Sequence, residues 1–375
     1  GIPHAGTYFD ARAHAPEMAV VTAEYTWTPM LEEIVQSILD GNFDSSFKYE
    51  GMSDGAISLT DWGPLYDTLS AEAQADIEAE TERVASAPGS VFIGPLVDIH
   101  GEVRAAEGES LDVDALRSMS WVLPNVEGVE TAAPEATAAP ASDEPLKLAF
   151  LYAGPADDMG WTQSFDEARQ ELESIFGDRV ETTYKENLWD ASVITQVMNQ
   201  AILDGADVIV GTSYEGGAPA MEIAAAHPDV YQIVSQWDNP GGLDNFVGYV
   251  NAPEDGAYIS GVVAGHLMGE GETAGWVDAF PIPYDIRTIN AFALGLTHSN
   301  PTASVRVVFT NDWNDLSLMT QASLSLIDSG VTFLASSMGG PAIGEPAESA
   351  GIPHAGTYFD ARAHAPEMAV VTAEY

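Results

Sequence analysis

The chain has 375 residues, of which 46% are hydrophobic and 9% aromatic, so it can bury one large or two medium cores, and a two-domain globular protein is the default expectation. Its 58 acidic and 12 basic residues give a formal net charge of −46, which disfavours binding to nucleic acids and to anionic membranes. The absence of cysteine excludes disulfides, thiolate metal sites and cysteine nucleophiles.

The first 25 residues recur letter for letter at the other end: residues 1–25 and 351–375 both read GIPHAGTYFDARAHAPEMAVVTAEY. Two apolar runs in this segment, GIPHAGTYF and MAVVTAEY, each predict a short strand. The segment lacks the basic stretch and apolar core of an export signal, and no run in the chain reaches the 18 or more apolar residues of a membrane helix. We therefore expect neither an export signal here nor a membrane span.

Residues 26–130 open with TWTPMLEEIVQSILDG, whose apolar spacing predicts an amphipathic helix over 26–41. The strand pair within residues 1–25 is the natural predecessor of this helix. Residues 131–145, TAAPEATAAPASDEP, contain no large apolar residue. Such a composition is typical of a flexible tether that packs into no core.

From residue 146 onward, strands and helices alternate. LKLAFLYA (146–153) is a continuous apolar run that predicts a buried first strand. Strands that alternate with helices of 10 to 15 residues predict βαβ units and a parallel sheet, so we assign residues 146–269 to a first α/β lobe. The further predicted strands are 180–187, 207–213, 230–236 and 246–251, and the predicted helices are 164–177, 193–205, 218–228 and 255–269.

The alternation begins again after residue 269. Residues 270–375 therefore predict a second doubly wound lobe, whose last strands come from the second copy of the repeated segment. The predicted strands before that copy are 273–280, 305–311 and 331–337, and the predicted helices are 286–299 and 318–330.

Each copy of the repeated segment has a neighbour that fits it. The second copy completes the second lobe, and the first precedes the helix at 26–41. The simplest repeating unit is therefore 350 residues long and starts at the tether near residue 131. The chain is interpreted as a circular permutation of that unit with a 25-residue overlap, although a slice of a tandem repeat gives the same letters.

One place in the second sheet is available for two identical segments, because strand pairing admits a single copy there. We expect the carboxyl-terminal copy in that place, since its connection to the second lobe is short and its closure entropy small. The other copy would dangle, add to a sheet edge, or swap into another molecule. A monomer is expected, with a strand-swapped dimer as the alternative.

Two doubly wound lobes in series predict a cleft between them, with ligand-binding groups at the carboxyl ends of strands. Aromatic residues follow five of these strand ends. Flat aromatic faces accompanied by carboxylates and amides suit a planar ligand rich in heteroatoms, and a sugar would stack on them too. The candidate ligand-binding residues are Asp158, Trp161, Ser213, Tyr214, Trp237, Phe280, Asn311, Trp313, Asp10 with its copy Asp360, and Trp27.

Nothing in the sequence predicts a catalytic or metal site. The side chains of the adjacent Asp157 and Asp158 diverge and do not form an acid–base pair. The histidines lie apart without metal-ligand spacing, and GxSxG, P-loop and GxGxxG motifs are absent. We therefore expect a protein that is not an enzyme and needs no cofactor or metal.

Several longer stretches resemble one family. GPADDMGWTQSFDEAR, GADVIVGTSYEG, DAFPIPYDIRTINAFALG, VVFTNDWND and GAISLTDWGPLYD are similar to segments of the basic membrane protein family, the substrate-binding lipoproteins of ABC importers, whose best-known members bind purine nucleosides. The resemblance extends over essentially the whole 350-residue unit in permuted order.

The resemblance implies a type I periplasmic-binding-protein fold, a ligand held between two hinged lobes, an ABC permease as partner, and an extracytoplasmic, lipid-anchored native form. The cysteine that carries the lipid in that family is absent here. The family also implies that Trp161 and Tyr214 are ligand contacts of the first lobe, and Phe280 and Trp313 those of the second. Asp10, or its copy Asp360, is implied to pair with a ribose or base, and Trp27 to lie near the hinge.

Two questions stay open at this point. The Gly-Trp pair in the first turn replaces the Asn-Asp pair of the nucleoside-binding members, so a free base and a nucleoside are both compatible with the sequence. A ligand-sensing receptor or effector module of the same fold, binding another small molecule such as a sugar, is the alternative function. A nucleoside hydrolase is a weaker third.

Overall fold

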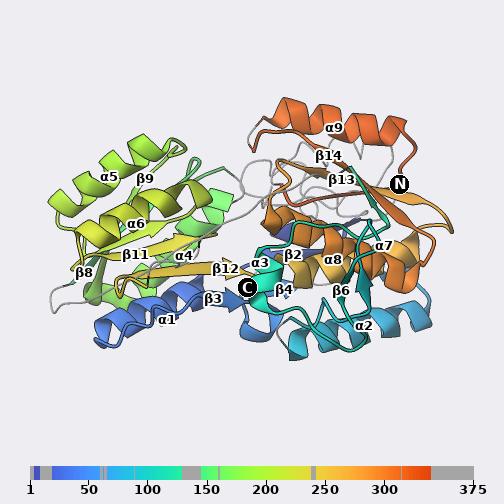
Figure 1. Ribbon diagram of the computed structural model, residues 1–375, viewed down its shortest axis with the longest axis horizontal. Coiled ribbons are helices and arrows are strands. Elements are labelled where there is room, and N and C mark those ends of the chain that lie inside the picture. The colour runs from blue at the N-terminus through green and yellow to red at the C-terminus, as the bar shows by residue number, and fades with distance from the viewer. Residues whose placement is uncertain are drawn as a thin grey trace. The chain divides into compact units, whose positions relative to one another are not determined.

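The protein divides into two compact units, each assembled from distant parts of the sequence (Figure 1). Unit 1 comprises the described parts of residues 1–25, 51–133 and 252–375, and unit 2 those of residues 26–50 and 134–251. The computed structural model describes residues 4–8, 19–59, 62, 66–87, 89–128, 145–158, 161–237, 242–313 and 315–338.

Unit 2 is built around a six-stranded sheet with the strand order β3-β12-β11-β10-β8-β9. Every neighbouring pair in it is parallel. Parallel neighbours require crossover connections, and a helix lies between β8 and β9, between β9 and β10, and between β10 and β11 along the chain. The strands are β3 (Lys48–Glu50), β8 (Leu146–Leu151), β9 (Val180–Lys185), β10 (Val208–Gly211), β11 (Tyr231–Ser235) and β12 (Phe246–Asn251).

Helices cover both faces of this sheet. Figure 1 shows α1 and α5 on opposite sides of it, and α1 contacts α4 while α5 contacts α6. Ala149 and Leu151 of β8 join the apolar cluster of the α5–α6 face, and Leu148 and Phe150, at the alternate positions, are also buried. A strand covered on both faces is a continuous apolar run, as in LKLAFL. The helices are α1 (Thr28–Leu39), α4 (Trp161–Phe176), α5 (Ala191–Leu203) and α6 (Gly217–Ala226), with 3-10 turns at Gly177–Arg179 and Tyr214–Gly216.

Unit 1 contains, within the described residues, a parallel sheet of order β15-β13-β14-β7 and two smaller sheets. In the order β1-β2-β4, β1 and β2 are parallel, whereas β2 and β4 are antiparallel. β5 and β6 form an antiparallel pair. The strands are β1 (His4–Tyr8), β2 (Ala19–Tyr25), β4 (Ile57–Leu59), β5 (Leu96–Val97), β6 (Val103–Ala105), β7 (Val126–Glu127), β13 (Thr273–Asp278), β14 (Ser304–Phe309) and β15 (Phe333–Ser336).

Helices α7 and α8 of unit 1 pack against each other at glycines. A Cβ at Gly261 would lie 2.1 Å from the carbonyl oxygen of Phe292, and one at Gly295 would lie 2.0 Å from that of Tyr258. Any larger residue at either position must push the two backbones apart. The helices of the unit are α2 (Ala71–Ser86), α3 (Val113–Arg117), α7 (Pro253–Leu267), α8 (Pro283–Ser299) and α9 (Leu316–Asp328), with 3-10 turns at Met52–Asp54 and Tyr66–Thr68.

A buried ion pair also joins α7 to α8. Arg287 Nε lies 2.9 Å from Glu254 Oε2, and the two side chains are 2% and 1% exposed. Arg287 Nη1 also donates to the carbonyl oxygen of Leu116 in α3, at 3.2 Å. Because a buried charge without its partner is strongly destabilising, this network holds α7 and α8 in register with the segment that contains α3.

The first copy of the repeated segment supplies β1 and β2, whereas residues 351–375 lie outside the described residues. The expectation that the carboxyl-terminal copy takes that place concerns residues outside the described part of the chain and stays a prediction. The first copy is attached at this place through its chain connections. β2 continues through Thr26 and Trp27 into α1, and its antiparallel partner β4 lies in the stretch of chain that follows.

The α/β class with parallel sheets is confirmed, as are the predicted alternating strands and helices between residues 146 and 337. The division between the units falls between Asn251 and Ala252 and not at residue 269, because α7 packs on α8. The tether residues 131–144 lie outside the described residues. No helix in the described part of the chain is long and apolar enough to cross a membrane.

The α7–α8 contact yields a prediction about stability. Gly295→Ala places a methyl group against the Tyr258 backbone and should lower the free energy of unfolding by about 1–3 kcal/mol, the usual cost of overpacking. Chemical denaturation measures this change. Gly269→Ala is the matched control, because Gly269 is exposed and the three atoms nearest to its Cβ would all belong to the Glu272 carboxyl group and not to a backbone. Equal stabilities of the two variants would contradict the tight packing.

Candidate functional site

The carboxyl ends of β8, β10 and β11 lie at one edge of the sheet in unit 2, and α4 starts there. Asp158 accepts hydrogen bonds from the backbone N–H groups of Thr162 and Gln163, each at 3.0 Å. A carboxylate in this position caps the first turn of a helix and interacts favourably with its dipole. Asp158, a predicted ligand residue, therefore holds the start of α4, where Trp161 lies.

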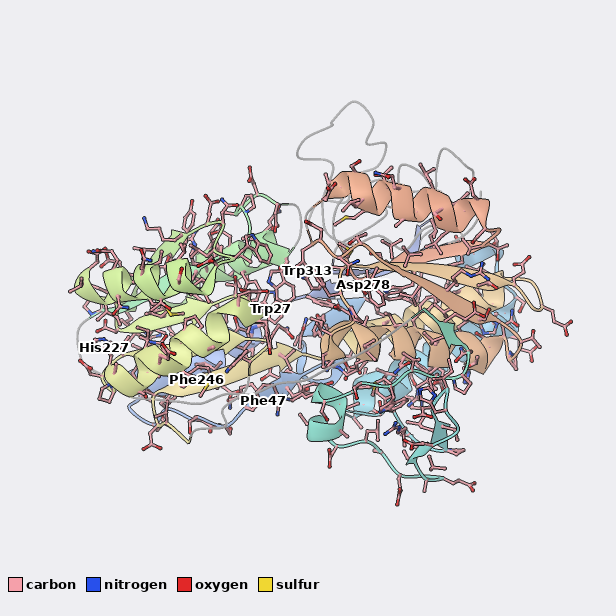
Figure 2. All side chains as sticks on the ribbon, turned by 45° about the horizontal axis from the view of Figure 1, so that its top comes forward. Trp27, Phe47, His227, Phe246, Asp278 and Trp313 are labelled. Atoms are coloured by element: carbon pink, nitrogen blue, oxygen red, sulfur yellow. The ribbon has the colours of Figure 1, made fainter. Side chains whose placement is uncertain are left out.

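Trp161 rests on a cluster of rings in unit 2. Trp27, only 1% exposed, stacks on Phe165 with ring centroids 4.3 Å apart. Trp161 meets Trp27 edge-on at 5.2 Å and Phe165 in the same manner at 5.2 Å. The structure thus brings the predicted residues Trp161 and Trp27 together. Trp27, labelled in Figure 2, is buried, whereas Trp161 is partly exposed.

The polar atoms of these two indoles already have partners. Trp161 Nε1 donates to the carbonyl oxygen of Thr212 at 2.7 Å, and Trp27 Nε1 donates to Ser164 Oγ at 2.9 Å. Trp161 is thereby tied to the end of β10. Because its N–H is occupied, a ligand would meet Trp161 through the ring.

A second aromatic pair follows β10 and β11. Tyr214 and Trp237 have ring centroids 4.6 Å apart, and Tyr214 is 45% exposed. A Cβ at Gly217 would lie 1.9 Å from the Trp237 ring, so only glycine admits this ring position. Ser213 precedes the 3-10 turn that carries Tyr214 and is partly exposed. Ser213, Tyr214 and Trp237 therefore occupy the sheet edge on which they were predicted.

Unit 1 has a comparable edge at the ends of β13 and β14. Phe280 and Trp313 have ring centroids 5.6 Å apart. Asn311 has a left-handed backbone, with φ of 58°, and its N–H donates to the carbonyl oxygen of Ala279 at 2.9 Å. The predicted residues Phe280, Asn311 and Trp313 are thus gathered at one edge. Asp10 and Asp360 lie outside the described residues.

A buried carboxyl group at this edge was missed by the sequence analysis. Asp278, the last residue of β13, is completely buried and accepts hydrogen bonds from Trp276 Nε1 at 2.8 Å, Ala279 N at 2.9 Å and Ser337 Oγ at 2.5 Å. Burial raises the pKa of Asp278 from 3.8 to about 6, although the three donors oppose that rise. Figure 2 marks Asp278 and Trp313, which come from neighbouring strand ends.

Asp285 is a second buried carboxyl group beside Asp278. It lies in the first turn of α8, and its Oδ1 is 3.5 Å from the same Ser337 hydroxyl. Its Oδ2 is buried and has no hydrogen-bond partner among the described residues. Burial, followed by the nearby Asp278 charge, raises the pKa of Asp285 well above its ordinary value. Asp285 is therefore neutral under conditions where exposed carboxylates are charged.

One sequence pattern could have indicated that Asp278 and Asp285 are buried. An aspartate that closes an apolar strand in GWVD, followed by another seven residues later at a helix start, departs from the usual solvent exposure of acids. No group of three or more His, Asp or Glu side chains in the described part of the chain is arranged to hold a metal ion.

Comparison with known proteins identifies a family match. Residues 146–372 match the Bmp family, described as ABC transporter substrate-binding protein PnrA-like. A purine-binding protein of Brucella abortus (strain 2308) is 32% identical over 227 residues, which make up 60% of this chain and 64% of the relative. A candidate ABC transporter glucose-binding protein, TsgA13, of Haloferax volcanii is 32% identical over 214 residues, 57% of this chain and 53% of the relative.

The chain thus spans less than two thirds of the length of both curated relatives. Among solved structures, an ABC transporter solute-binding protein from Aeropyrum pernix K1 superposes with a TM-score of 0.50 at 18% identity, covering 56% of this chain and 61% of its own. That likeness is one of fold, and it agrees with the predicted periplasmic-binding-protein class.

The buried state of Asp278 gives a pH prediction. The folded protein keeps the Asp278 proton up to about pH 6, whereas the unfolded chain releases it near the ordinary pKa of 3.8. Folding therefore binds a proton between these values, and the contribution of Asp278 to stability falls as pH rises through that window. We expect the free energy of unfolding, measured with urea from pH 4 to 8, to fall less with rising pH in Asp278→Asn than in the parent.

The control for this experiment is Asp328→Asn, which changes an exposed aspartate at the end of α9. It should keep the parental pH dependence. If Asp278→Asn and the parent show the same slope between pH 4 and 6, Asp278 does not titrate as described.

Proposed function

Because the chain belongs to the Bmp family of PnrA-like ABC transporter substrate-binding proteins, we propose that it is an extracytoplasmic solute receptor that binds a purine base or nucleoside and delivers it to an ABC permease. The family consists of solute-binding proteins and not of enzymes. The proposal is supported chiefly by the aromatic residues at the carboxyl edge of each unit, which suit a planar ligand.

The choice of purine rests on two observations together. One of the similar proteins is named as purine-binding. Trp161 packs edge-on against Trp27 and Phe165 and donates its N–H to Thr212, so it offers a ring that is already ordered before a ligand arrives. An ordered aromatic surface binds a flat ligand at low entropic cost. We propose Trp161 and Tyr214 as ligand contacts in unit 2 and, separately, Phe280 and Trp313 as ligand contacts in unit 1.

Polar recognition is proposed to come from the remaining candidate residues. Ser213 and Asn311 lie at the same edges as the rings and supply hydroxyl and amide groups. Asp10 or Asp360 is proposed to accept from a base or ribose, as the family resemblance implies. A lipid-anchored native form is proposed on the same ground.

A sugar is the second candidate ligand. It is favoured by the TsgA13 relative, which has the same identity of 32% and is named as glucose-binding. Sugars also stack on aromatic rings, so the edges described above do not by themselves exclude one.

Thermal unfolding against adenine, guanine, hypoxanthine, their nucleosides, and several sugars including glucose tests the proposal. A ligand that binds only the folded protein adds about 2.7 kcal/mol at one hundred times its dissociation constant, which raises the midpoint visibly. A purine should raise the midpoint, and glucose should not. A shift with sugars alone would select the second candidate, and a cooperative transition that no ligand shifts would refute both.

Two tryptophan variants, one at the proposed site and one away from it, test whether the ligand contacts Trp161. Trp161→Ala should weaken purine binding by on the order of 2 kcal/mol, the usual cost of removing an aromatic anchor, as measured by calorimetry. Trp121→Ala is the matched control, because Trp121 is also partly exposed but precedes β7 in unit 1, away from the carboxyl edges. It should leave affinity unchanged.

Circular dichroism and the unfolding midpoint check that Trp161→Ala remains folded, since Trp161 also packs on Trp27 and Phe165. A folded Trp161→Ala protein with parental affinity would remove Trp161 from the site.

A further inference from the structure

We propose that the place of β1 and β2 in unit 1 is a docking site for residues 351–375 of the same chain, which compete there with residues 1–25. The structure has the first copy in place. The two segments are identical in all 25 residues, so they carry the same pairing pattern.

The place admits a single copy. β2 pairs along one side with β1, from His4 opposite Ala19 to Tyr8 opposite Glu24. Along its other side it pairs with β4, where Tyr25 lies opposite Ile57. β1 in turn contacts β15 and α7. Since both edges of β2 are paired, the second copy can enter only by displacing the first.

The family match points to the second copy independently. It extends from residue 146 to residue 372, so it includes residues 351–372. In the order of the family, this segment therefore follows α9 and β15. In the structure the corresponding strands come instead from the start of the chain. The family order thus assigns residues 351–372 to this place, whereas the structure has residues 1–25 there.

The second copy can reach this place. β15 ends at Ser336, and residues 337–350 connect it to the second copy. This connection spans up to ~50 Å when extended, and β1 contacts β15 directly. Each competitor is attached to the same molecule, so neither meets the cost of bringing two molecules together.

Exchange would change the support of the aromatic edge in unit 2. With the first copy docked, β2 ends at Tyr25 and the chain enters α1 at Thr28, so Trp27 lies on a short anchored connection. With the second copy docked, residues 1–25 are released and this anchor is lost. Trp27 stacks on Phe165 and supports Trp161, so the exchange acts on the residues beneath the proposed ligand contact.

Disulfide trapping distinguishes the two occupancies, and the natural absence of cysteine makes it clean. Ala23 lies directly opposite Leu59 in the antiparallel β2–β4 pair. Cβ atoms of directly opposed residues are about 4.5–5.5 Å apart, close to what a disulfide requires. Ala373 is the counterpart of Ala23 in the second copy. Leu59→Cys with Ala23→Cys traps the first copy, and Leu59→Cys with Ala373→Cys traps the second.

After mild oxidation of the full chain, both pairs should cross-link within monomers, as measured by mass spectrometry of the monomer fraction. Adding Val21→Pro, which places a proline within β2 of the first copy and weakens its pairing, should raise the cross-link between positions 59 and 373 about tenfold, the effect of about 1.4 kcal/mol. The same substitution in the other copy, Val371→Pro, should lower it about tenfold and leave the cross-link between positions 59 and 23 intact.

Two results would overturn the proposal. One is the absence of a cross-link between positions 59 and 373, with or without Val21→Pro, while positions 59 and 23 cross-link readily. The other is a cross-link between positions 59 and 373 that occurs only in dimers, which would assign the exchange to a second molecule. The pairs without proline test the proposal even if Val21→Pro fails to fold.

Discussion

Parallel pairing in the two large sheets is the constraint on which the candidate sites depend. Parallel strands all end at the same edge of their sheet, so the loops that follow them meet there. Tyr214 and Trp237 become neighbours for this reason in unit 2, and Asp278 and Ser337 in unit 1. Residues far apart in the chain are brought together by strand direction, and no single segment contains a site.

The exposed rings at the carboxyl edge of the sheet in unit 2 are held in place by buried residues. Trp27 is buried, stacks on Phe165 and meets Trp161 edge-on, while the Trp161 N–H is bound by Thr212. Gly217 leaves the space that the Trp237 ring fills. These contacts hold the rings in place without a ligand, so a flat ligand that bound there would not have to order them.

Much of this arrangement was predictable because its signals are local. Continuous apolar runs such as residues 146–153 marked strands buried on both faces, and alternation with helices predicted parallel sheets. The rings followed from their positions after strand ends. Asp278 and Asp285 were not predictable in the same way, because their burial depends on β15 and on the Ser337 hydroxyl, which lie far along the chain.

The repeated segment shows where local sequence stops deciding. Residues 1–25 and 351–375 have identical letters, and identical letters predict identical strands. A pairing pattern therefore cannot choose between them, and the choice falls to the connections: α1 directly after the first copy, and the stretch 337–350 before the second. Loop closure changes slowly with length, so connections discriminate weakly compared with the pairing itself. Strand pairing can thus specify the place of β1 and β2 strongly, while the choice between the two identical segments for that place is specified only weakly.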